Sequence, residues 1–380
     1  MYRQMKKAFF LIKPVSGNCN LACHYCFYRD LLEHQIIHNF GFMDSSTVDI
    51  LIERAFELDA DILTFVFQGG EPTLAGLPYF EHFVKKTQTC TKSNLRHQHP
   101  QINFSIQTNA IALNTEWARF FKRESFLVGI SIDGARIIHD TYRTHYDGSG
   151  TWAEVMHGIE LLRKEGVLLN ALCVVTDFAA DNAELIYNRL RNLGFEWIQF
   201  IPWLPPLKEE SVLSSELLTP GAYAHFLKAI FDLYYQDWLH GSVVHVQWFD
   251  NLVAIAAGMP PESCGMLGCC PVNFTVEANG SVFPCDFYVS DEWCLGNIHD
   301  LSFQSMKEGI IAHHFIERSS YIDPSCRICF AFFLCRGGCR RYREPFFDGK
   351  LKINRYCTAF KEFFQYAGEH IMNMAAFYRN

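Results

Sequence analysis

Three cysteines near the start of the chain have a spacing that could hold a metal centre. Cys19, Cys23 and Cys26 follow the apolar run Phe9–Ile12, which is typical of a buried strand, so we expect the thiols on a loop at the end of that strand. Three thiolates are one ligand short of a tetrahedral zinc site or of a four-cysteine iron–sulfur cluster. One iron of a cluster held in this way stays open to a small molecule that carries an amine and a carboxylate.

Two interpretations of this loop are open. If the small molecule is S-adenosylmethionine, an electron from the cluster can cleave its sulfonium and release a carbon radical. Alternatively, the three cysteines line one face of a helix, where cysteine behaves as a small buried hydrophobe. The preceding Gly17-Asn18 is a turn sequence, and Asn20 and His24 place polar groups between the thiols, so the loop is favoured.

Eight of the ten cysteines in the last third of the chain fit two further four-cysteine sites. They are Cys264, Cys270, Cys285, Cys326, Cys329, Cys335, Cys339 and Cys357. The C-x2-C start at Cys326 is equally typical of a zinc knuckle, so the spacing alone leaves zinc and iron–sulfur clusters open. Eight thiols without a histidine favour clusters, because two redox-active clusters could carry electrons for a radical cluster.

Composition limits the class of protein. The 380 residues carry a net charge of −8 with a pI near 6.0, which gives no general attraction to nucleic acid or to anionic lipid. The first apolar run is too short for a signal peptide, and no stretch reaches transmembrane length. We therefore expect the fifteen cysteines to be reduced and the protein to be cytoplasmic, without membrane or nucleic-acid partners.

The first half of the chain alternates strands and helices. Strands are expected at Phe9–Pro14, Ile62–Phe67, Ile102–Gln107, Leu127–Ile132, Leu168–Val175 and Trp197–Ile201. Helices are expected at Thr47–Leu58, Tyr79–Thr87, Thr115–Lys122, Trp152–Lys164 and Ala183–Asn192. Ser45 and Ser46 are expected to cap the first of these helices. Six β-α repeats predict an α/β fold with a parallel sheet and outer helices, a partial (β/α)6 barrel.

The second half has a different pattern. A proline-rich segment at 202–206 interrupts the repeats, and a long helix is expected at Gly221–Leu239. Asn279-Gly280 between two short alternating segments predicts a β-hairpin, and an amphipathic helix is expected at Thr358–Phe377. We expect two domains, a barrel at residues 1–235 and a cysteine-rich domain at residues 236–380.

Polar groups are predicted at the C-terminal ends of the barrel strands, where the functional groups of parallel barrels gather. Gly69-Gly70 lets a backbone approach a ligand closely, Ser131 could hydrogen-bond a ribose or a carboxylate, and Arg143 could clamp a carboxylate. Each has a plainer interpretation as a turn, a helix cap or a solvated side chain. Asp286, directly after Cys285, is either a general base or a solvated turn residue.

These residues together resemble the radical S-adenosylmethionine (SAM) superfamily, and more narrowly the anaerobic sulfatase-maturating enzymes with a C-terminal SPASM extension. The resemblance covers nearly the whole chain, with runs more specific than the three-cysteine loop. They are Leu11–Pro14, Cys26–Tyr28, Phe67–Leu77, Leu172–Thr176, Pro284–Val289 and Gly337–Arg341. The fold that it implies is a partial radical-SAM barrel followed by a cysteine-rich SPASM extension.

The resemblance implies oxidation of one cysteine or serine in a sulfatase precursor to Cα-formylglycine. In the family's mechanism a 5′-deoxyadenosyl radical takes a hydrogen atom from the target's Cβ, a base removes a proton, and an electron leaves through an auxiliary cluster. The implied cofactors are three [4Fe–4S] clusters, with S-adenosylmethionine as cosubstrate. The implied partners are a precursor peptide with the motif Cys/Ser-x-Pro/Ala-x-Arg and an electron donor of the flavodoxin or ferredoxin type.

By position, the resemblance assigns roles to individual residues. Cys19, Cys23 and Cys26 would hold the radical cluster. One auxiliary set would be Cys264, Cys270, Cys285 and Cys339, and the other Cys326, Cys329, Cys335 and Cys357. The positions that would contact S-adenosylmethionine are Tyr25, Gly70, Ser131, Arg143 and Leu204. Asp286 would accept the proton, and whether Cys269 or its neighbour Cys270 is the ligand stays open.

The remaining cysteines and a group of arginines receive no chemical role. Cys90, Cys173 and Cys294 are expected to be buried thiols. The local basic patch is expected to face solvent, and it comprises Arg336, Arg340, Arg341 and Arg343.

Two alternative functions stay open. A peptide maturase of the same superfamily that forms thioethers or other crosslinks shares the extension and both cluster sets. A different class is a zinc-bound binding module on a β-α scaffold. Asp286 favours the sulfatase-maturating reaction, because removal of a proton from the target is intrinsic to aldehyde formation.

Overall fold

The computed structural model describes residues 5–29, 39–93, 99–204, 218–344 and 351–378. The chain forms two compact units. Unit 1 comprises Met1–Ser131, Arg143–Leu169 and Val272–Phe315, and unit 2 comprises Ile132–Tyr142, Asn170–Pro271 and Ile316–Asn380. Each unit is built from three segments of the chain, so the predicted boundary between residues 235 and 236, which divides the chain once, stays a prediction. Within the predicted proline-rich segment, Pro205 and Pro206 lie outside the described residues.

Unit 1 is built on a mainly parallel sheet. Its strands β1 (Lys7–Ile12), β2 (Ile62–Phe67), β3 (Gln101–Thr108) and β4 (Leu127–Ser131) pair in chain order and in parallel. On the other side of β1 lies β8 (Phe274–Val276), also parallel, followed by the antiparallel β9 (Ser281–Phe283) and β10 (Gly296–Asn297). Ile12 pairs with Phe67 on one side and with Val276 on the other, so the carboxyl ends of three strands are level.

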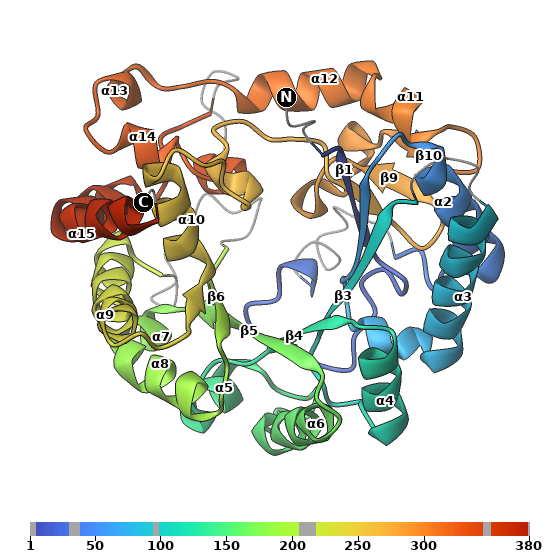
Figure 1. The fold of residues 1–380 in the computed structure, drawn as a ribbon, viewed down its shortest axis with the longest axis horizontal. Coiled ribbons are helices and arrows are strands. Elements are labelled where there is room, and N and C mark those ends of the chain that lie inside the picture. The colour runs from blue at the N-terminus through green and yellow to red at the C-terminus, as the bar shows by residue number, and fades with distance from the viewer. Residues whose placement is uncertain (1–4, 30–38, 94–98, 205–217, 345–350, 379–380) are drawn as a thin grey trace. The chain divides into compact units, whose positions relative to one another are not determined.

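Helices follow the strands of unit 1 and lie along their outer side (Figure 1). They are α2 (Ser45–Glu57), α3 (Leu77–Ser93), α4 (Thr115–Arg123), α6 (Trp152–Lys164) and α11 (Phe303–Lys307), and α12 (Ile310–Ser319) begins in this unit. Phe65 and Phe67 of β2 pack against Phe83 of α3, with ring centroids 5.2 and 4.9 Å apart. This aromatic packing fixes β2 against α3, near the strand ends where site residues are predicted.

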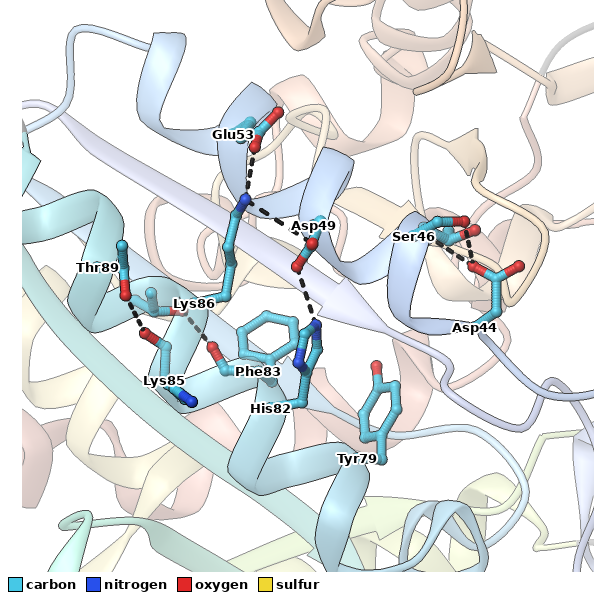
Figure 2. Close-up of polar contacts among 12 residues, drawn as sticks. Asp44, Ser46, Asp49, Glu53, Tyr79, His82, Phe83, Lys85, Lys86 and Thr89 are labelled. Carbon is cyan, nitrogen blue, oxygen red and sulfur yellow. Dashed lines mark hydrogen bonds and ion pairs between the residues drawn. The ribbon is translucent and has the colours of Figure 1, made fainter.

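Two predictions for the helices of unit 1 are corrected by side-chain hydrogen bonds. Asp44, rather than Ser45 or Ser46, caps α2, because its carboxylate accepts the Thr47 backbone N–H at 2.7 Å. Helix α3 extends six residues beyond its predicted end at Thr87, to Ser93. Threonine and serine hydroxyls in its last turns donate to backbone carbonyls of the same helix, as the Thr89 hydroxyl does to the Lys85 carbonyl at 2.9 Å (Figure 2). These polar residues therefore do not end the helix.

Unit 2 holds parallel strands with helices beside them. Strand β5 (Leu168–Val175), most of which lies in this unit, pairs with β6 (Trp197–Pro202), which pairs with β7 (His245–Val246). The helices are α5 (Arg136–Tyr142), α7 (Asp177–Asp181), α8 (Ala183–Asn192), α9 (Pro220–Leu239), α10 (Gln247–Ala256), α13 (Pro324–Arg327), α14 (Phe332–Cys335) and α15 (Cys357–Phe377). The long helices α9 and α15 pack side by side (Figure 1), with the Phe231 and Phe363 rings 5.5 Å apart.

Short 3-10 helices connect several elements. They are η1 (Pro72–Ala75), η2 (Cys264–Met266), η3 (Asp286–Tyr288), η4 (Asp291–Trp293) and η5 (Arg340–Arg343). The predicted hairpin is confirmed, since β8 and β9 pair in antiparallel fashion around Gly280, whose φ is 82°. Among the described residues, no helix combines the length and the apolar character that crossing a membrane requires.

Candidate active site

The three-cysteine segment is a loop at the end of β1, so its interpretation as a helix face is wrong. The backbone turns directly after the strand, where the Asn18 N–H donates to the Val15 carbonyl at 3.0 Å. Burial raises the pKa of the Cys19 thiol to about 12, with smaller contributions from Glu71, Cys23 and Cys26. The electrostatic influence of the other two thiols on Cys19 means that the three lie close together. Such a set fits three ligands of one cluster.

The Gly69-Gly70 turn packs directly against this loop. Gly70 has a φ of 53°, and a Cβ at this position would lie 1.9 Å from the Asn18 carbonyl oxygen. The next N–H, that of Glu71, donates to the same oxygen at 2.8 Å. Only glycine permits this approach, so the turn fixes the cysteine loop against the end of β2.

Glu71 joins three strand ends, a role that the sequence did not indicate. Its buried carboxylate accepts hydrogen bonds from the Thr73 and Thr108 hydroxyls, each at 2.7 Å, and from the Asn109 N–H at 2.7 Å. Burial raises the pKa of Glu71, while these hydrogen bonds oppose the change. The Asn109 amide in turn donates to Asn20 at 2.8 Å, which connects β3 to the cysteine loop.

The positions predicted to contact S-adenosylmethionine are distributed over both units. Arg143 is buried rather than solvated, and its Nη1 donates to the Tyr25 hydroxyl at 3.1 Å. Gly70 belongs to the turn described above, and Ser131 is the last residue of β4. These four residues lie in unit 1, whereas Leu204 is buried in unit 2.

Asp286 is a buried carboxylate, so its interpretation as a solvated turn residue is wrong. Its Oδ2 accepts hydrogen bonds from the Tyr28 hydroxyl and from the Gln68 amide, the latter at 3.3 Å. Its Oδ1 has no hydrogen-bond partner among the described residues. Burial raises the pKa of Asp286, and the charge of Lys13 and the Tyr28 hydrogen bond oppose this, whereas Glu277 adds to it.

An ion pair beneath this carboxylate was not indicated by the sequence. Lys13 Nζ lies 2.5 Å from a Glu277 carboxylate oxygen, and both side chains are fully buried. The ammonium also lies 4.7 Å from the centre of the Tyr28 ring. Lys13 directly follows β1 and Glu277 directly follows β8, so the pair could have been found only from the register that places Ile12 opposite Val276.

Four cysteines form a group within unit 2. They are Cys326, Cys329, Cys335 and Cys357. The pKa of Cys335 is raised to about 11, mainly by burial, with smaller contributions from the other three thiols. This mutual influence places the four thiols close together, which fits one four-cysteine cluster.

A second group in unit 2 comprises Cys264, Cys270 and Cys339. Burial raises the pKa of Cys339 to about 12, with contributions from the other two. Cys270 is partly buried and its N–H donates to the Ser319 hydroxyl at 2.8 Å, whereas the neighbouring Cys269 is exposed. Cys285, the fourth member of this predicted set, lies in unit 1.

In the described part of the chain, no group of three or more histidine, cysteine, aspartate or glutamate side chains is arranged to bind a single metal ion.

Two family models match the chain. Residues 14–180 match the radical SAM superfamily, and residues 269–330 match an iron–sulfur cluster-binding domain, SPASM. The second match favours iron–sulfur clusters over zinc for the C-terminal cysteines.

Whole-chain comparisons identify the family. The chain is 40% identical to the cysteine-type anaerobic sulfatase-maturating enzyme of Clostridium perfringens, over 96% of this chain and 97% of that enzyme. The chain belongs to the family of anaerobic sulfatase-maturating enzymes. It is 30% identical to the serine-type enzyme of Bacteroides thetaiotaomicron, over 96% of this chain and 91% of that enzyme. The protein is therefore a radical SAM oxidoreductase.

Solved structures support the same family and fold. The structure of anSMEcpe with bound AdoMet and the Cp18Cys peptide has a TM-score of 0.91 and 39% identity, and the match covers 97% of this chain and 99% of that one. SuiB of Streptococcus suis bound to its precursor peptide has a TM-score of 0.63 at 11% identity, covering 93% and 76% of the two chains, which shows the fold alone. The predicted radical-SAM and SPASM architecture of this sulfatase-maturating enzyme is confirmed.

The predicted basic patch is not a solvated face in this enzyme. Arg340, Arg341 and Arg343 are buried, and Arg336 is partly exposed. Arg340 Nε lies 3.1 Å from Glu344, and Arg343 donates to the Tyr321 carbonyl at 2.6 Å. Arginine side chains are usually exposed, but here the Glu344 carboxylate and the Tyr321 carbonyl give two of these guanidinium groups partners in the interior.

The cysteines without an assigned role differ in burial. Cys173 is buried in β5, as predicted. Cys90 and Cys294 are partly exposed, which corrects the prediction for both. Lys86, one turn before Cys90 on α3, forms ion pairs with Asp49 and Glu53 of α2 (Figure 2).

Proposed function

We propose that this enzyme oxidises a single cysteine of a sulfatase precursor to Cα-formylglycine. The observation that carries the proposal is the environment of Asp286, a buried carboxylate with one oxygen held by Tyr28 and Gln68 and the other without a hydrogen-bond partner among the described residues. Aldehyde formation requires a base that takes a proton from the target side chain, and such an oxygen suits that role. Higher identity to cysteine-type than to serine-type relatives, 40% against 30%, supports cysteine as the target.

Three thiols in unit 1 fit the proposed radical cluster. Cys19, Cys23 and Cys26 would hold a [4Fe–4S] cluster, since they lie close together on one loop and leave one ligand position unfilled. Such a cluster would supply the electron that cleaves bound S-adenosylmethionine, and the carbon radical released would take a hydrogen atom from the target's Cβ. The residues proposed to contact the cosubstrate are Tyr25, Gly70, Ser131, Arg143 and Leu204.

The cysteines of the SPASM extension would hold two auxiliary [4Fe–4S] clusters. One set would be Cys264, Cys270, Cys285 and Cys339, and the other Cys326, Cys329, Cys335 and Cys357. Contributions of neighbouring thiols to the pKa values of Cys335 and Cys339 support the second set and three members of the first, Cys264, Cys270 and Cys339. The partial burial of Cys270 and the exposure of Cys269 support Cys270 as the ligand. We also propose a division into a barrel at residues 1–235 and an auxiliary-cluster domain at residues 236–380.

Within the proposed mechanism, Asp286 Oδ1 accepts the proton of the target's thiol, since one Cβ hydrogen leaves as a hydrogen atom and the other stays in the aldehyde. Tyr28 and Gln68 hold Oδ2, so the carboxylate keeps one orientation while the substrate is bound. Burial raises the pKa of Asp286 and makes its ionised form a stronger base than a solvated aspartate. The positive charge of Lys13 opposes that change and favours the ionised form.

We also propose a substrate motif and an electron donor for the enzyme. The substrate would carry the motif Cys-x-Pro-x-Arg, or the serine and alanine variants of it. Electrons would come from a flavodoxin or a ferredoxin. A cytoplasmic location would keep the fifteen cysteines reduced and available to metal.

One assay tests the function. Anaerobically reduced enzyme is incubated with S-adenosylmethionine and a Cys-x-Pro-x-Arg peptide, and mass spectrometry and a hydrazide reagent detect the aldehyde. We expect 5′-deoxyadenosine and an aldehyde peptide; an intact peptide or a crosslinked product without aldehyde would contradict the proposal. A colourless protein with stoichiometric zinc would instead support a binding module.

Two variants separate the proposed roles in the same assay. Cys23→Ala removes a ligand of the radical cluster, so it should abolish cleavage of S-adenosylmethionine. Asp286→Asn should keep the iron content and suppress the aldehyde. Full product yield from Asp286→Asn would remove the base assignment, and retained cleavage by Cys23→Ala would remove the ligand assignment.

A further inference from the structure

Two tyrosines of unit 2 donate hydrogen bonds to consecutive backbone carbonyls at the end of β6. The Tyr342 hydroxyl donates to the Pro202 carbonyl at 2.8 Å, and the Tyr356 hydroxyl donates to the Trp203 carbonyl at 3.2 Å. The two tyrosine rings contact each other, with centroids 5.4 Å apart, and Tyr356 is 1% exposed. We call Tyr342 and Tyr356 the tyrosine pair. Packed rings whose hydroxyls bond to backbone hold that backbone in one position.

The carboxyl end of β6 pairs with a strand on one side only. On that side lies β5, and the Trp203 N–H continues the pairing by donating to the Val175 carbonyl at 3.0 Å. On the other side, among the described residues, β7 pairs only with Trp197 and Ile198 at the beginning of β6. Pro202 has no N–H with which to extend that pairing. The tyrosine pair therefore supplies hydrogen bonds that no strand of the described chain gives to these carbonyls.

The segments that carry the tyrosine pair also carry proposed cluster ligands. The Tyr342 N–H donates to the Cys339 carbonyl at 3.1 Å, and Tyr356 directly precedes Cys357. The two segments are joined, since the Arg355 N–H donates to the Tyr342 carbonyl at 2.9 Å. The end of β6 is thereby attached to segments that contribute to both proposed auxiliary-cluster sets.

The next residue of the chain is Leu204, which is 8% exposed and is one of the positions proposed to contact S-adenosylmethionine. It follows the carboxyl end of a parallel strand, where the ligands of parallel barrels bind. A planar peptide bond joins Leu204 to Trp203, so a shift of the Trp203 carbonyl moves the Leu204 backbone with it.

We propose that Tyr342 and Tyr356 are positioning residues for the cosubstrate, because they hold residues 202–204 in the conformation that lets Leu204 contact S-adenosylmethionine. This inference rests on the proposed function, since it takes Leu204 as a contact residue. The tyrosine pair touches no reacting atom and acts through the backbone at the end of β6. The C-terminal extension thereby sets the affinity for the cosubstrate, in addition to the cluster role proposed above.

The test removes one hydroxyl at a time. Tyr342→Phe and Tyr356→Phe keep the rings and delete the donors, and a double variant deletes both. Tyr366→Phe is the matched control, because the Tyr366 hydroxyl donates to Asp232 at 2.8 Å, and so joins α15 to α9 of the same unit, rather than to residues 202–204. Equilibrium dialysis of each anaerobic holoenzyme gives the Kd for S-adenosylmethionine. Iron content, kcat and the KM for S-adenosylmethionine are measured in parallel.

We expect each single variant to raise the Kd and the KM for S-adenosylmethionine about fivefold, since one neutral hydrogen bond changes an equilibrium constant by that factor. The double variant should show a larger rise than either single variant. Iron content and kcat should equal those of the wild type, because saturating cosubstrate keeps residues 202–204 in the binding conformation. Tyr366→Phe should match the wild type in every measurement.

Three results would overturn the proposal. The first is an unchanged Kd in the double variant. The second is an equal rise for Tyr366→Phe, which would indicate a general loosening of unit 2. The third is a lower iron content or a lower kcat at unchanged KM, which would mean that the tyrosine pair serves the clusters and not the cosubstrate. A wild type that binds S-adenosylmethionine without forming the aldehyde would refute the proposed function alone, because dialysis does not depend on the reaction.

Discussion

The buried ion pair between Lys13 and Glu277 allows a direct test of how the core of unit 1 supports the site. The change is Lys13→Met, which keeps the apolar stem and removes the charge. Both side chains are fully buried, and their charged atoms are 2.5 Å apart. Without Lys13, the Glu277 carboxylate would be left in the core without its counter-ion.

The expected cost follows from that burial. Removing one partner of a buried ion pair typically destabilises a protein by about 3–5 kcal/mol, because the remaining charge is uncompensated. Loss of the contact between the ammonium and the Tyr28 ring would add to this. The double variant Lys13→Met/Glu277→Leu should recover the wild-type stability, since apolar pairs of similar volume replace buried ion pairs at little cost.

The surface of the same unit supplies a matched control. Lys86 and Glu53 are also 2.5 Å apart, but their side chains are 21% and 57% exposed, and they join α3 to α2 (Figure 2). Lys86→Met should therefore cost less than about 1 kcal/mol. Urea unfolding of the anaerobic holoenzymes, followed by tryptophan fluorescence, gives the midpoints from which the free-energy differences are calculated.

Two outcomes would contradict the reasoning. If Lys13→Met were as mild as Lys86→Met, the pair could not be buried from water in solution. If the two substitutions at Lys13 and Glu277 were additive, with the double variant the least stable, the two residues would act independently.

Three further substitutions test the site and its supports. Gly70→Ala should weaken S-adenosylmethionine binding, measured by equilibrium dialysis, because its Cβ would lie 1.9 Å from the Asn18 carbonyl; unchanged affinity would remove the packing argument. Asp44→Ala should cost about 1 kcal/mol of unfolding free energy, and Asp44→Asn much less, because asparagine can also cap. Hydrogen bonds from Thr47 and then Ser46 lower the pKa of Asp44, so its contribution is present above the ordinary carboxyl pKa and is lost as pH falls through the folded value. Tyr28→Phe should reduce kcat with little change in iron content, because Asp286 would lose one of its two orienting donors; an unchanged kcat would contradict that role.

Local sequence was sufficient for the backbone framework. The six predicted strands are present within two residues of their expected ends, and Asn279-Gly280 forms the hairpin turn. These features depend on side-chain period and on the conformational freedom of glycine, which act over a few residues. The loop that carries Cys19, Cys23 and Cys26 was likewise predicted, because the apolar run and the turn residues before it are local signals.

Burial and long-range pairing were decided only by the tertiary structure. Arg340 and Arg343 have the sequence of a solvated patch and yet are buried, and Lys13 meets Glu277 only because β1 and β8 lie side by side. The same holds for Asp286, whose carboxylate meets Tyr28 from the far end of the chain. A charged side chain is stable inside a protein only where a distant segment supplies its partner, and no local pattern of residues records which segment that will be.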